Sequence, residues 1–286
     1  MKYRGRAVKD VSPMTAEPAP RGVDPTIPNA ARMYDYFLGG KDNFQADRDL
    51  ANLVLSVLPE TKEGTRQNRR LIGRIVRYLV DQGIRQFLDL GSGLPAQDNV
   101  HEVAHRFAPD ARVVYVDSDP VVCAHGRALL ADPERVAMIQ ADARRPAEVL
   151  RDPQVRELID FERPVAVLMM FLVHLVPDED DPQGFVAAYR EALAPGSYLA
   201  LSHVCADTAP ERMGRITEFY RQANAPFVPR SRTEIARFFG DFELIPPGLA
   251  SGAGPENVWP FGDEETSMFA DEETARMGCA GVGRKP

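Results

Sequence analysis

The chain has 286 residues, of which 44% are hydrophobic and 27% charged, as in ordinary globular proteins with one sizeable core. Its 34 basic and 42 acidic residues leave a formal charge of -8, which opposes nonspecific attraction to a phosphate backbone, so we expect no nucleic-acid partner. No stretch reaches the roughly 18 apolar residues of a membrane span, and the N-terminus lacks the apolar segment of a secretion signal, so we expect no membrane association and a cytoplasmic location.

Cysteine spacing bears on the redox compartment and on metal binding. The three cysteines, Cys123, Cys205 and Cys279, are odd in number and stand far apart, without a C-x-x-C pair. This pattern favours reduced thiols over a disulfide framework or a zinc site. We therefore expect no structural metal.

The N-terminal quarter of the chain predicts a tail followed by helices. Residues 1–24 show no periodicity and are rich in proline and in charged or small residues, so we expect a disordered tail. A first helix is predicted from Pro28 to the Gly39-Gly40 pair, because proline favours the first position of a helix and glycine its end.

Two further helices are predicted before the first strand. One spans residues 44–58, capped by Asp42 or Asn43 and stopped by Pro59. The other spans residues 61–82, has an apolar stripe, and is closed by a glycine.

From residue 84 the sequence alternates strands and helices, which predicts a parallel sheet covered on both faces. The strands are expected to end near residues 89, 117, 142 and 171, with a fifth at 198–204 and two more at 242–245 and 277–282. Helices are expected at 98–107, 120–131, 153–159 and 184–194. Thr208 with Glu211, and Ser231 with Glu234, fit capping boxes that begin two later helices.

The first strand leads directly into a glycine-rich turn. Residues 86–95 read QFLDLGSGLP, which is a short buried strand, a turn and the opening of a helix, as in the nucleotide sites of doubly wound sheets. Gly91 and Gly93 allow a tight turn and close approach to a ligand. Asp89 is unusual before a phosphate-binding loop, and it suits a ligand that carries a positive group.

Acids also end the next two strands. Asp117 lies 24 residues after Gly93, about the distance at which a carboxylate accepts from both hydroxyls of a ribose, and Asp142 ends the third strand. Because carboxyl ends of parallel strands meet at one edge of a sheet, Asp89, Asp117 and Asp142 describe one crevice.

These segments carry a resemblance to a known family. FLDLGSGLP, VVYVDSDP and the acid of IQADA resemble the first three motifs of class I S-adenosylmethionine (SAM)-dependent methyltransferases. The chain also resembles a narrower bacterial family of these enzymes, of DUF574 type, whose acceptor is unidentified. The segments that carry this resemblance are ARMYDYFLGGKDNFQADR, QNRRLIGRIVRYL and NVHEVAH. The likeness covers roughly residues 25 to 286. One departure is Pro95, which stands where the loop usually has its third glycine.

The resemblance implies an α/β fold with a doubly wound, mostly parallel seven-stranded sheet, a Rossmann-like methyltransferase fold whose last two strands form an antiparallel edge. Residues 84–286 would form the SAM-binding domain and residues 25–83 an N-terminal helical lid. The implied activity is methyl transfer from SAM to a small-molecule acceptor, and such a displacement requires alignment rather than a protein nucleophile.

The resemblance also assigns cofactor contacts. Asp89 would face the methionine amino group, and Asp117, followed by Ser118, would accept from the ribose hydroxyls. Asp142 and Ala143 would border the adenine. The turn Gly91, Ser92 and Gly93 would run beneath the methionine and ribose.

The segment 29–47 has more polar and aromatic groups than a helix needs to cover a sheet. We hypothesise that it closes over the crevice around the Gly39-Gly40 hinge, with Tyr36, Lys41 and Asn43 toward the cofactor or acceptor. The alternative is a static cap. From the third helix, Asn68 or Arg69 is a candidate for the methionine carboxylate.

Two residues are candidates for catalysis. His174 follows the fourth strand, at the end where acceptors lie in this fold, and is a candidate for proton transfer, although a lone histidine is more often a packing residue. Tyr36 is the second candidate. The acidic run 178–181 indicates either a solvated turn or, less simply, a divalent metal.

Three other functions remain open at the level of sequence. Residues 101–105 match the zinc motif H-E-x-x-H, but they fall on the helix after the glycine turn and lack a third-ligand pattern. Residues 91–96 also fit G-x-G-x-x-A, as in NAD(P)-dependent oxidoreductases, but Asp89 and Pro95 oppose that function. A non-catalytic SAM-binding regulatory module is the third.

Overall fold

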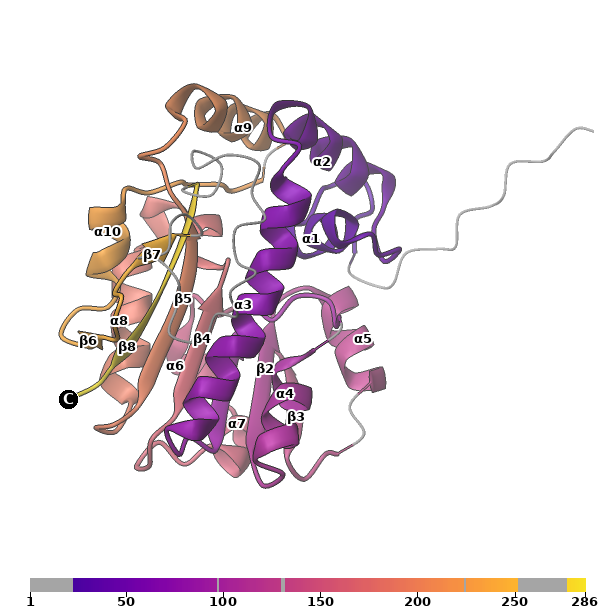
Figure 1. Cartoon of the computed structure of the whole chain (residues 1–286). Coiled ribbons are helices and arrows are strands. Elements are labelled where there is room, and N and C mark those ends of the chain that lie inside the picture. The colour runs from indigo at the N-terminus through magenta and orange to yellow at the C-terminus, as the bar shows by residue number, and fades with distance from the viewer. Residues whose placement is uncertain (1–22, 97, 130–131, 224, 252–276) are drawn as a thin grey trace, which may run out of the picture.

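The computed structural model describes residues 23–96, 98–129, 132–223, 225–251 and 277–286 (Figure 1). The tail predicted over 1–24 therefore lies almost wholly outside the described residues.

A single sheet forms the centre of the molecule. Its order is β3-β2-β1-β4-β5-β8-β6, with β7 paired to β8. The first five strands are parallel, whereas β8 is antiparallel to β5, β6 and β7. The predicted mostly parallel sheet with an antiparallel edge is confirmed, and the two-residue β7 is an addition to it. The strands are β1 (Gln86–Leu90), β2 (Arg112–Asp117), β3 (Val136–Gln140), β4 (Ala166–Met170), β5 (Tyr198–Val204), β6 (Glu243–Leu244), β7 (Ala250–Ser251) and β8 (Gly278–Arg284).

Helices cover both faces, because successive side chains of a strand point to opposite sides. Phe87 of β1 and Val113 of β2 pack beneath α3 (Thr61–Asp81), α4 (Val100–Phe107) and α5 (Pro120–Leu129). Their neighbours Leu88 and Val114 pack on the other face, against the remaining helices of the sheet layer. These are α6 (Pro146–Val149), α7 (Pro153–Leu158), α8 (Pro182–Ala192) and α10 (Arg232–Arg237).

Three helices form a separate layer beyond one end of the sheet. They are α1 (Ala30–Leu38), α2 (Gln45–Val57) and α9 (Pro210–Gln222), which lie together in Figure 1 and which we call the helical cap. The helical cap has its own small core, in which Met33, Leu50 and Val54 meet Ile216 and Tyr220. By contrast, α3 packs its apolar stripe on the sheet and also contacts α1 through Tyr34, so it joins the helical cap to the sheet layer.

Several helix starts differ from the prediction. The first helix, α1, begins at Ala30 after the N-cap Asn29, not at Pro28. The N-cap of α2 is Phe44, whose N–H donates to Asp47 Oδ2 at 2.7 Å, so neither Asp42 nor Asn43 caps it. The predicted capping residue Thr208 does not cap α9. Ala209 is its N-cap and Pro210 its first residue, a position that favours proline. Likewise, α8 begins at Pro182 rather than residue 184. The capping box of Ser231 and Glu234 is confirmed.

Candidate functional site

The glycine turn after β1 is held by the neighbouring strand. The N–H groups of Gly91 and Ser92 both donate to the Val116 carbonyl, at 2.8 and 3.2 Å. Gly91 and Gly93 have φ of +66° and +68°, which favours glycine. A Cβ on Gly91 would lie 2.6 Å from Leu172 Cδ1, whereas one on Gly93 would meet no atom of the described chain within 4 Å. Gly93 therefore borders open space.

Asp117, at the end of β2, is fixed by backbone donors. Its Oδ2 accepts from Gly93 N–H and its Oδ1 from Asp119 N–H, both at 2.9 Å. Burial raises the pKa of Asp117, and these two N–H groups oppose that effect. Each carboxylate oxygen retains acceptor capacity for a ligand hydroxyl.

Asp89, at the end of β1, is 8% exposed and makes no hydrogen bond within the described residues. Burial raises its pKa to about 7, the positive charge of Arg69 opposes that rise, and the charge of Asp117 adds to it. An ionised carboxylate without partners is unfavourable in such a place. The site therefore fits a cationic ligand group, such as the ammonium of a methionine moiety.

The structure brings Arg69 and Asn68 of α3 to different neighbours. Arg69 acts electrostatically on Asp89, and its Nη2 lies 3.4 Å from Asn99 Oδ1. Asn68 is buried, with Nδ2 donating to the Tyr34 hydroxyl at 3.0 Å and Oδ1 accepting from Ser202 Oγ at 2.8 Å. Of the two candidates, Arg69 is the one beside the glycine turn.

The predicted adenine-binding residues are already engaged. Asp142 accepts from Arg144 Nη2 at 2.7 Å, and this arginine lowers the Asp142 pKa. The Ala143 carbonyl accepts from the Tyr189 hydroxyl at 3.0 Å. Ser118 is exposed next to Asp117. An adenine contact by Asp142 would share this carboxylate with Arg144.

A buried ion cluster joins the helical cap to the site, and sequence reasoning missed it. Arg32 Nε donates to Asp47 Oδ2 at 2.9 Å and Arg32 Nη1 to Asp119 Oδ2 at 3.0 Å, with all three side chains buried. Asp119 also caps the start of α5 through Val121 N–H. Because Asp119 N–H holds Asp117, the cap is connected to the end of β2.

Tyr36 does not face the strand ends, which corrects the sequence hypothesis for this residue. Its hydroxyl donates to Asn52 Oδ1 of α2 at 3.1 Å, and Lys62 Nζ lies 5.8 Å from its ring centroid. Tyr34, two positions earlier and so on the other side of α1, has its ring 6.4 Å from that of Phe171, after β4.

The loop after α1 is tied down by Asp35. Asp35 Oδ2 accepts from Asp42 N–H at 2.9 Å and from Asn43 Nδ2 at 2.8 Å. A Cβ on Gly40 would overlap the Asp35 carboxylate, so this glycine permits a close contact within the loop. Lys41 is exposed. These contacts favour the static alternative for the Gly39-Gly40 pair.

His174 lies buried in a short turn after β4, with its ring 5.4 Å from those of Phe171 and His203. Its Nδ1 is buried and makes no hydrogen bond within the described residues. Burial, followed by the charges of His203 and Arg230, holds its pKa well below the usual range. The imidazole is thus held in its neutral form, and its protonation in this place is unfavourable.

The zinc motif has structural partners instead. His101 Nδ1 lies 2.7 Å from the Tyr115 hydroxyl and His105 Nε2 lies 2.8 Å from the Ala111 carbonyl. In the acidic run, Asp178 accepts from Arg230 and Asp180 from Arg144. Among the described residues, no group of three or more histidines, cysteines or acids is arranged for a metal, and no helix is long and apolar enough to span a membrane.

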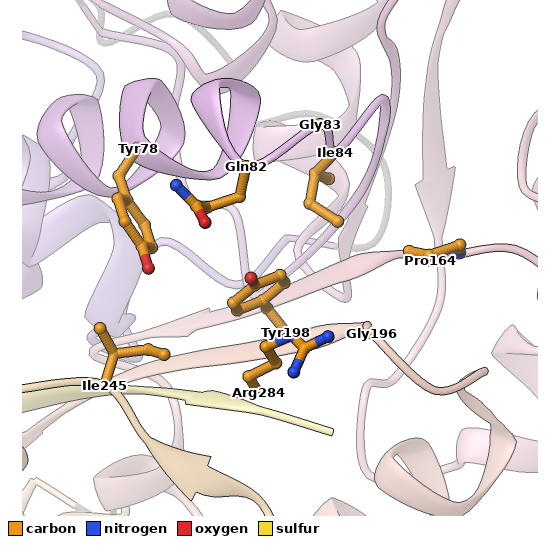
Figure 2. A pocket seen from close by; sticks show the side chains of 9 residues that line it. All are labelled: Tyr78, Gln82, Gly83, Ile84, Pro164, Gly196, Tyr198, Ile245 and Arg284. Carbon is orange, nitrogen blue, oxygen red and sulfur yellow. The ribbon is translucent and has the colours of Figure 1, made fainter. Parts of the chain in front are cut away.

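A cavity of about 510 Å³ lies elsewhere, at the amino ends of the strands (Figure 2). Tyr78 of α3 and Gln82, the residue after α3, border it on one side, and Tyr198 and Arg284 border it on the other. It contains none of the strand-end acids and no part of the glycine turn, so it is distinct from the crevice of Asp89 and Asp117.

A doubly wound sheet of this order, with a glycine turn after β1 and acids at the ends of β1 and β2, defines a Rossmann-like methyltransferase. The chain belongs to the S-adenosyl methyltransferase family, whose family model matches residues 16–286. The enzyme therefore transfers a methyl group from SAM. The resemblance in the sequence is confirmed, and nothing favours the oxidoreductase or zinc alternatives.

Two solved structures are similar over nearly the whole chain. One, from Thermobifida fusca YX, is a presumed methyltransferase with 42% identity; the match covers 91% of this chain and 96% of that one, with a TM-score of 0.83. The other is a DUF574 family protein from Streptomyces avermitilis MA-4680 with 39% identity, coverage of 91% and 98%, and a TM-score of 0.85. No curated protein matches the chain.

Proposed function

We propose that the enzyme binds SAM in the crevice bordered by Asp89, the glycine turn and Asp117, and that it methylates a small molecule held at the ends of β4 and β5. The observation that carries this proposal is the buried Asp89 carboxyl, which lacks a hydrogen-bond partner in the described chain. When bound, SAM supplies a methyl group on a sulfonium, and the protein's task is to align donor and acceptor and to exclude water.

At the methionine end, Asp89 and Arg69 are complementary to the two charges of an amino acid. Asp89 receives the ammonium group, while Arg69, whose charge already acts on Asp89, receives the carboxylate. A charge-assisted hydrogen bond of this kind is worth roughly 1.5 to 3 kcal/mol. Asn68 supports the site indirectly, because its carboxamide links Tyr34 to Ser202.

At the nucleoside end, Asp117 accepts from the ribose hydroxyls, supported by the two backbone N–H groups that orient its carboxylate. Ser92, Gly93 and Ser118 border the same space. Asp142 and Ala143 are proposed to lie along the adenine, with Asp142 sharing its charge with Arg144.

The helical cap is proposed to cover the acceptor side of the crevice. Support comes from Tyr34, which reaches Phe171 after β4, and from Arg32, which joins the cap to Asp119. Of the residues 25–83 expected to form a lid, those of α1 and α2 carry this role. Residues 1–24 are not part of the proposal, so their removal should leave SAM affinity unchanged.

Titration calorimetry with SAM and with S-adenosylhomocysteine tests the binding site. Asp89→Asn should abolish or strongly weaken binding of both compounds, because the amide cannot balance an ammonium charge. The matched control is Asp132→Asn, a partly exposed acid before the amino end of β3 that pairs with Arg135. Equal affinity of Asp89→Asn and the wild type would refute the site.

A further inference from the structure

Five ring side chains form a continuous row at the carboxyl end of β4. The ring of Tyr34 lies 6.4 Å from that of Phe171, Phe171 lies 5.4 Å from His174, and His174 lies 5.6 Å from Phe227. Phe227 in turn stacks on Tyr220 of α9 at 4.5 Å. We call these five residues the aromatic row. Tyr34, Phe171 and Phe227 are partly exposed, so the row offers apolar ring surface to a ligand.

His174 is the polar group of the aromatic row that lacks a partner. It is 6% exposed, and its Nδ1 makes no hydrogen bond within the described residues. The polar groups around it are paired: Ser202 Oγ donates to Asn68 and accepts from Phe171 N–H. A buried ring nitrogen without a partner is unfavourable, so the site favours a ligand group that donates a hydrogen bond.

The buried side chain of Arg230 determines which ligand charge is favoured near His174. Arg230 is buried, and its Nη1 lies 3.4 Å from His203 Nε2, while the rings of His203 and His174 are 5.4 Å apart. Its acidic partner, Asp178, has a side chain that is 78% exposed and therefore well solvated. The net field around His174 is positive, which opposes an ammonium acceptor and stabilises an oxygen anion.

Arg230 also fixes the turn that carries His174. Nη1 donates to the Val173 carbonyl at 3.0 Å and Nη2 to the Val176 carbonyl at 2.9 Å. Val228 N–H donates to the His174 carbonyl at 2.7 Å. Arg230 is thus a positioning residue, acting on the acceptor site through His174.

Resting on the proposed function, we propose that the acceptor is a planar aromatic compound with a hydroxyl group, held against the aromatic row with its O–H directed to His174. The acceptor oxygen forms a bond to the methyl carbon while the bond from that carbon to sulfur breaks. The electron pair of the broken bond stays on sulfur. His174 Nδ1 accepts the hydrogen bond of the hydroxyl and orients its oxygen, Arg230 stabilises the developing negative charge, and the hydroxyl proton is released to water. The products are an aryl methyl ether and S-adenosylhomocysteine.

A phenol with a coloured anion tests this proposal without turnover. 4-Nitrophenol is titrated into the protein saturated with S-adenosylhomocysteine, near neutral pH, and the visible absorption of its anion reports its ionisation. We expect binding with an increased anion fraction. His174→Ala should weaken binding about tenfold, because it removes the hydrogen bond that Nδ1 accepts, while the matched control His105→Ala, on α4, should keep wild-type binding.

Arg230→Lys keeps the charge but not the two carbonyl contacts, and Arg230→Met removes both. We expect the anion fraction of bound probe to be retained in the lysine variant and lost in the methionine variant. If Arg230→Met fails to fold, Arg230→Lys still tests the positioning role, because the displaced turn should weaken probe binding.

Turnover completes the test with a panel of phenols, anilines and aliphatic alcohols, scored by release of S-adenosylhomocysteine. Release with phenols alone supports the proposal. Binding or methylation of anilines or alcohols but no phenol, failure of every phenol to bind, or unchanged probe binding in His174→Ala would overturn it. If calorimetry also detects no SAM, the proposed function itself fails; normal SAM binding confines the failure to the acceptor class.

Discussion

The carboxylate of Asp117 accepts a hydrogen bond from the backbone N–H of Gly93 at 2.9 Å. This bond joins the end of β2 to the turn after β1, and Asp119 N–H holds the second oxygen at the same distance. An acid held in this way is oriented before any ligand arrives, so little conformational entropy is lost when it binds hydroxyl groups.

Replacing Asp117 should weaken SAM binding. Loss of a charge-assisted hydrogen bond worth roughly 1.5 to 3 kcal/mol predicts about 10- to 150-fold lower affinity for Asp117→Ala in calorimetry. Asp132→Asn serves as the control, because this partly exposed acid precedes the amino end of β3, whereas the crevice lies at the carboxyl ends of the strands. Wild-type affinity in a folded Asp117→Ala protein would remove Asp117 from the ribose site.

Asp89 should lower the stability of the ligand-free enzyme at neutral and alkaline pH. Its pKa is raised from 3.8 to about 7 by burial. Between these values the folded protein holds a proton that the unfolded chain has lost, so stability falls as pH rises through this window and stays low above it. A difference of about 3 pKa units corresponds to an upper bound of roughly 4 kcal/mol.

Asp89→Asn should therefore melt at a higher temperature than the wild type at pH 8, while the difference should vanish below about pH 4. Thermal melts across this range, without ligand, measure the effect. The same variant should lose SAM-induced stabilisation. A wild type that is as stable as Asp89→Asn at pH 8 would contradict the burial of an ionisable group here.

Two tyrosines of α1 provide a matched comparison. The Tyr34 hydroxyl donates to the Thr65 carbonyl at 3.1 Å and accepts from Asn68 Nδ2 at 3.0 Å. Tyr34→Phe leaves Asn68 Nδ2 without this acceptor in a buried place, whereas the Thr65 carbonyl keeps its bond within α3, and the change should lower the free energy of unfolding by about 1 to 3 kcal/mol. Tyr36→Phe removes one exposed bond to Asn52 and should change it by less than about 0.5 kcal/mol. Denaturant titration compares them, and equal losses would argue against the packing described for α1.

The ion cluster of Arg32 should be important for attachment of the helical cap. Arg32→Met leaves the buried carboxylates of Asp47 and Asp119 without their cation, which should cost about 3 to 5 kcal/mol of stability. Arg66→Met removes an arginine with a side chain 49% exposed and should cost no more than about 1 kcal/mol. Chemical unfolding measures both variants, and SAM affinity of the folded Arg32→Met protein shows whether the loss extends to the crevice. A loss no larger than that of Arg66→Met would contradict the buried cluster.

The strand ends and the glycine turn could be predicted because their signals are local. A run of apolar residues ending in Asp89 or Asp117 identifies a strand end, and parallel strands bring such ends together. Arg32 and Asp119 are 87 residues apart, and no local pattern indicates that pairing. The same applies to Arg230, whose partners lie in the turn after β4.

The sequence also did not show which side chains of α1 point toward the strand ends. A density of polar groups identified the segment but not its inward face, so Tyr36 was chosen where Tyr34 reaches Phe171. The cap of α2 was misassigned for a related reason. Asn43 Nδ2 donates to Asp35, and the Phe44 N–H is satisfied by Asp47 from inside the helix, a choice that depends on tertiary contacts rather than on the sequence of the turn.

The most direct measurement is calorimetric titration of SAM at pH 6.5 in two buffers that differ in ionisation enthalpy. Because burial raises the pKa of Asp89 to about 7 in the free enzyme, a substantial fraction of the molecules is protonated at this pH, and an ammonium ligand should displace that proton. We predict one SAM per chain with a net release of protons. Two results would contradict the account. One is that SAM does not bind; the other is that SAM binds the wild type without releasing a proton and still binds Asp89→Asn.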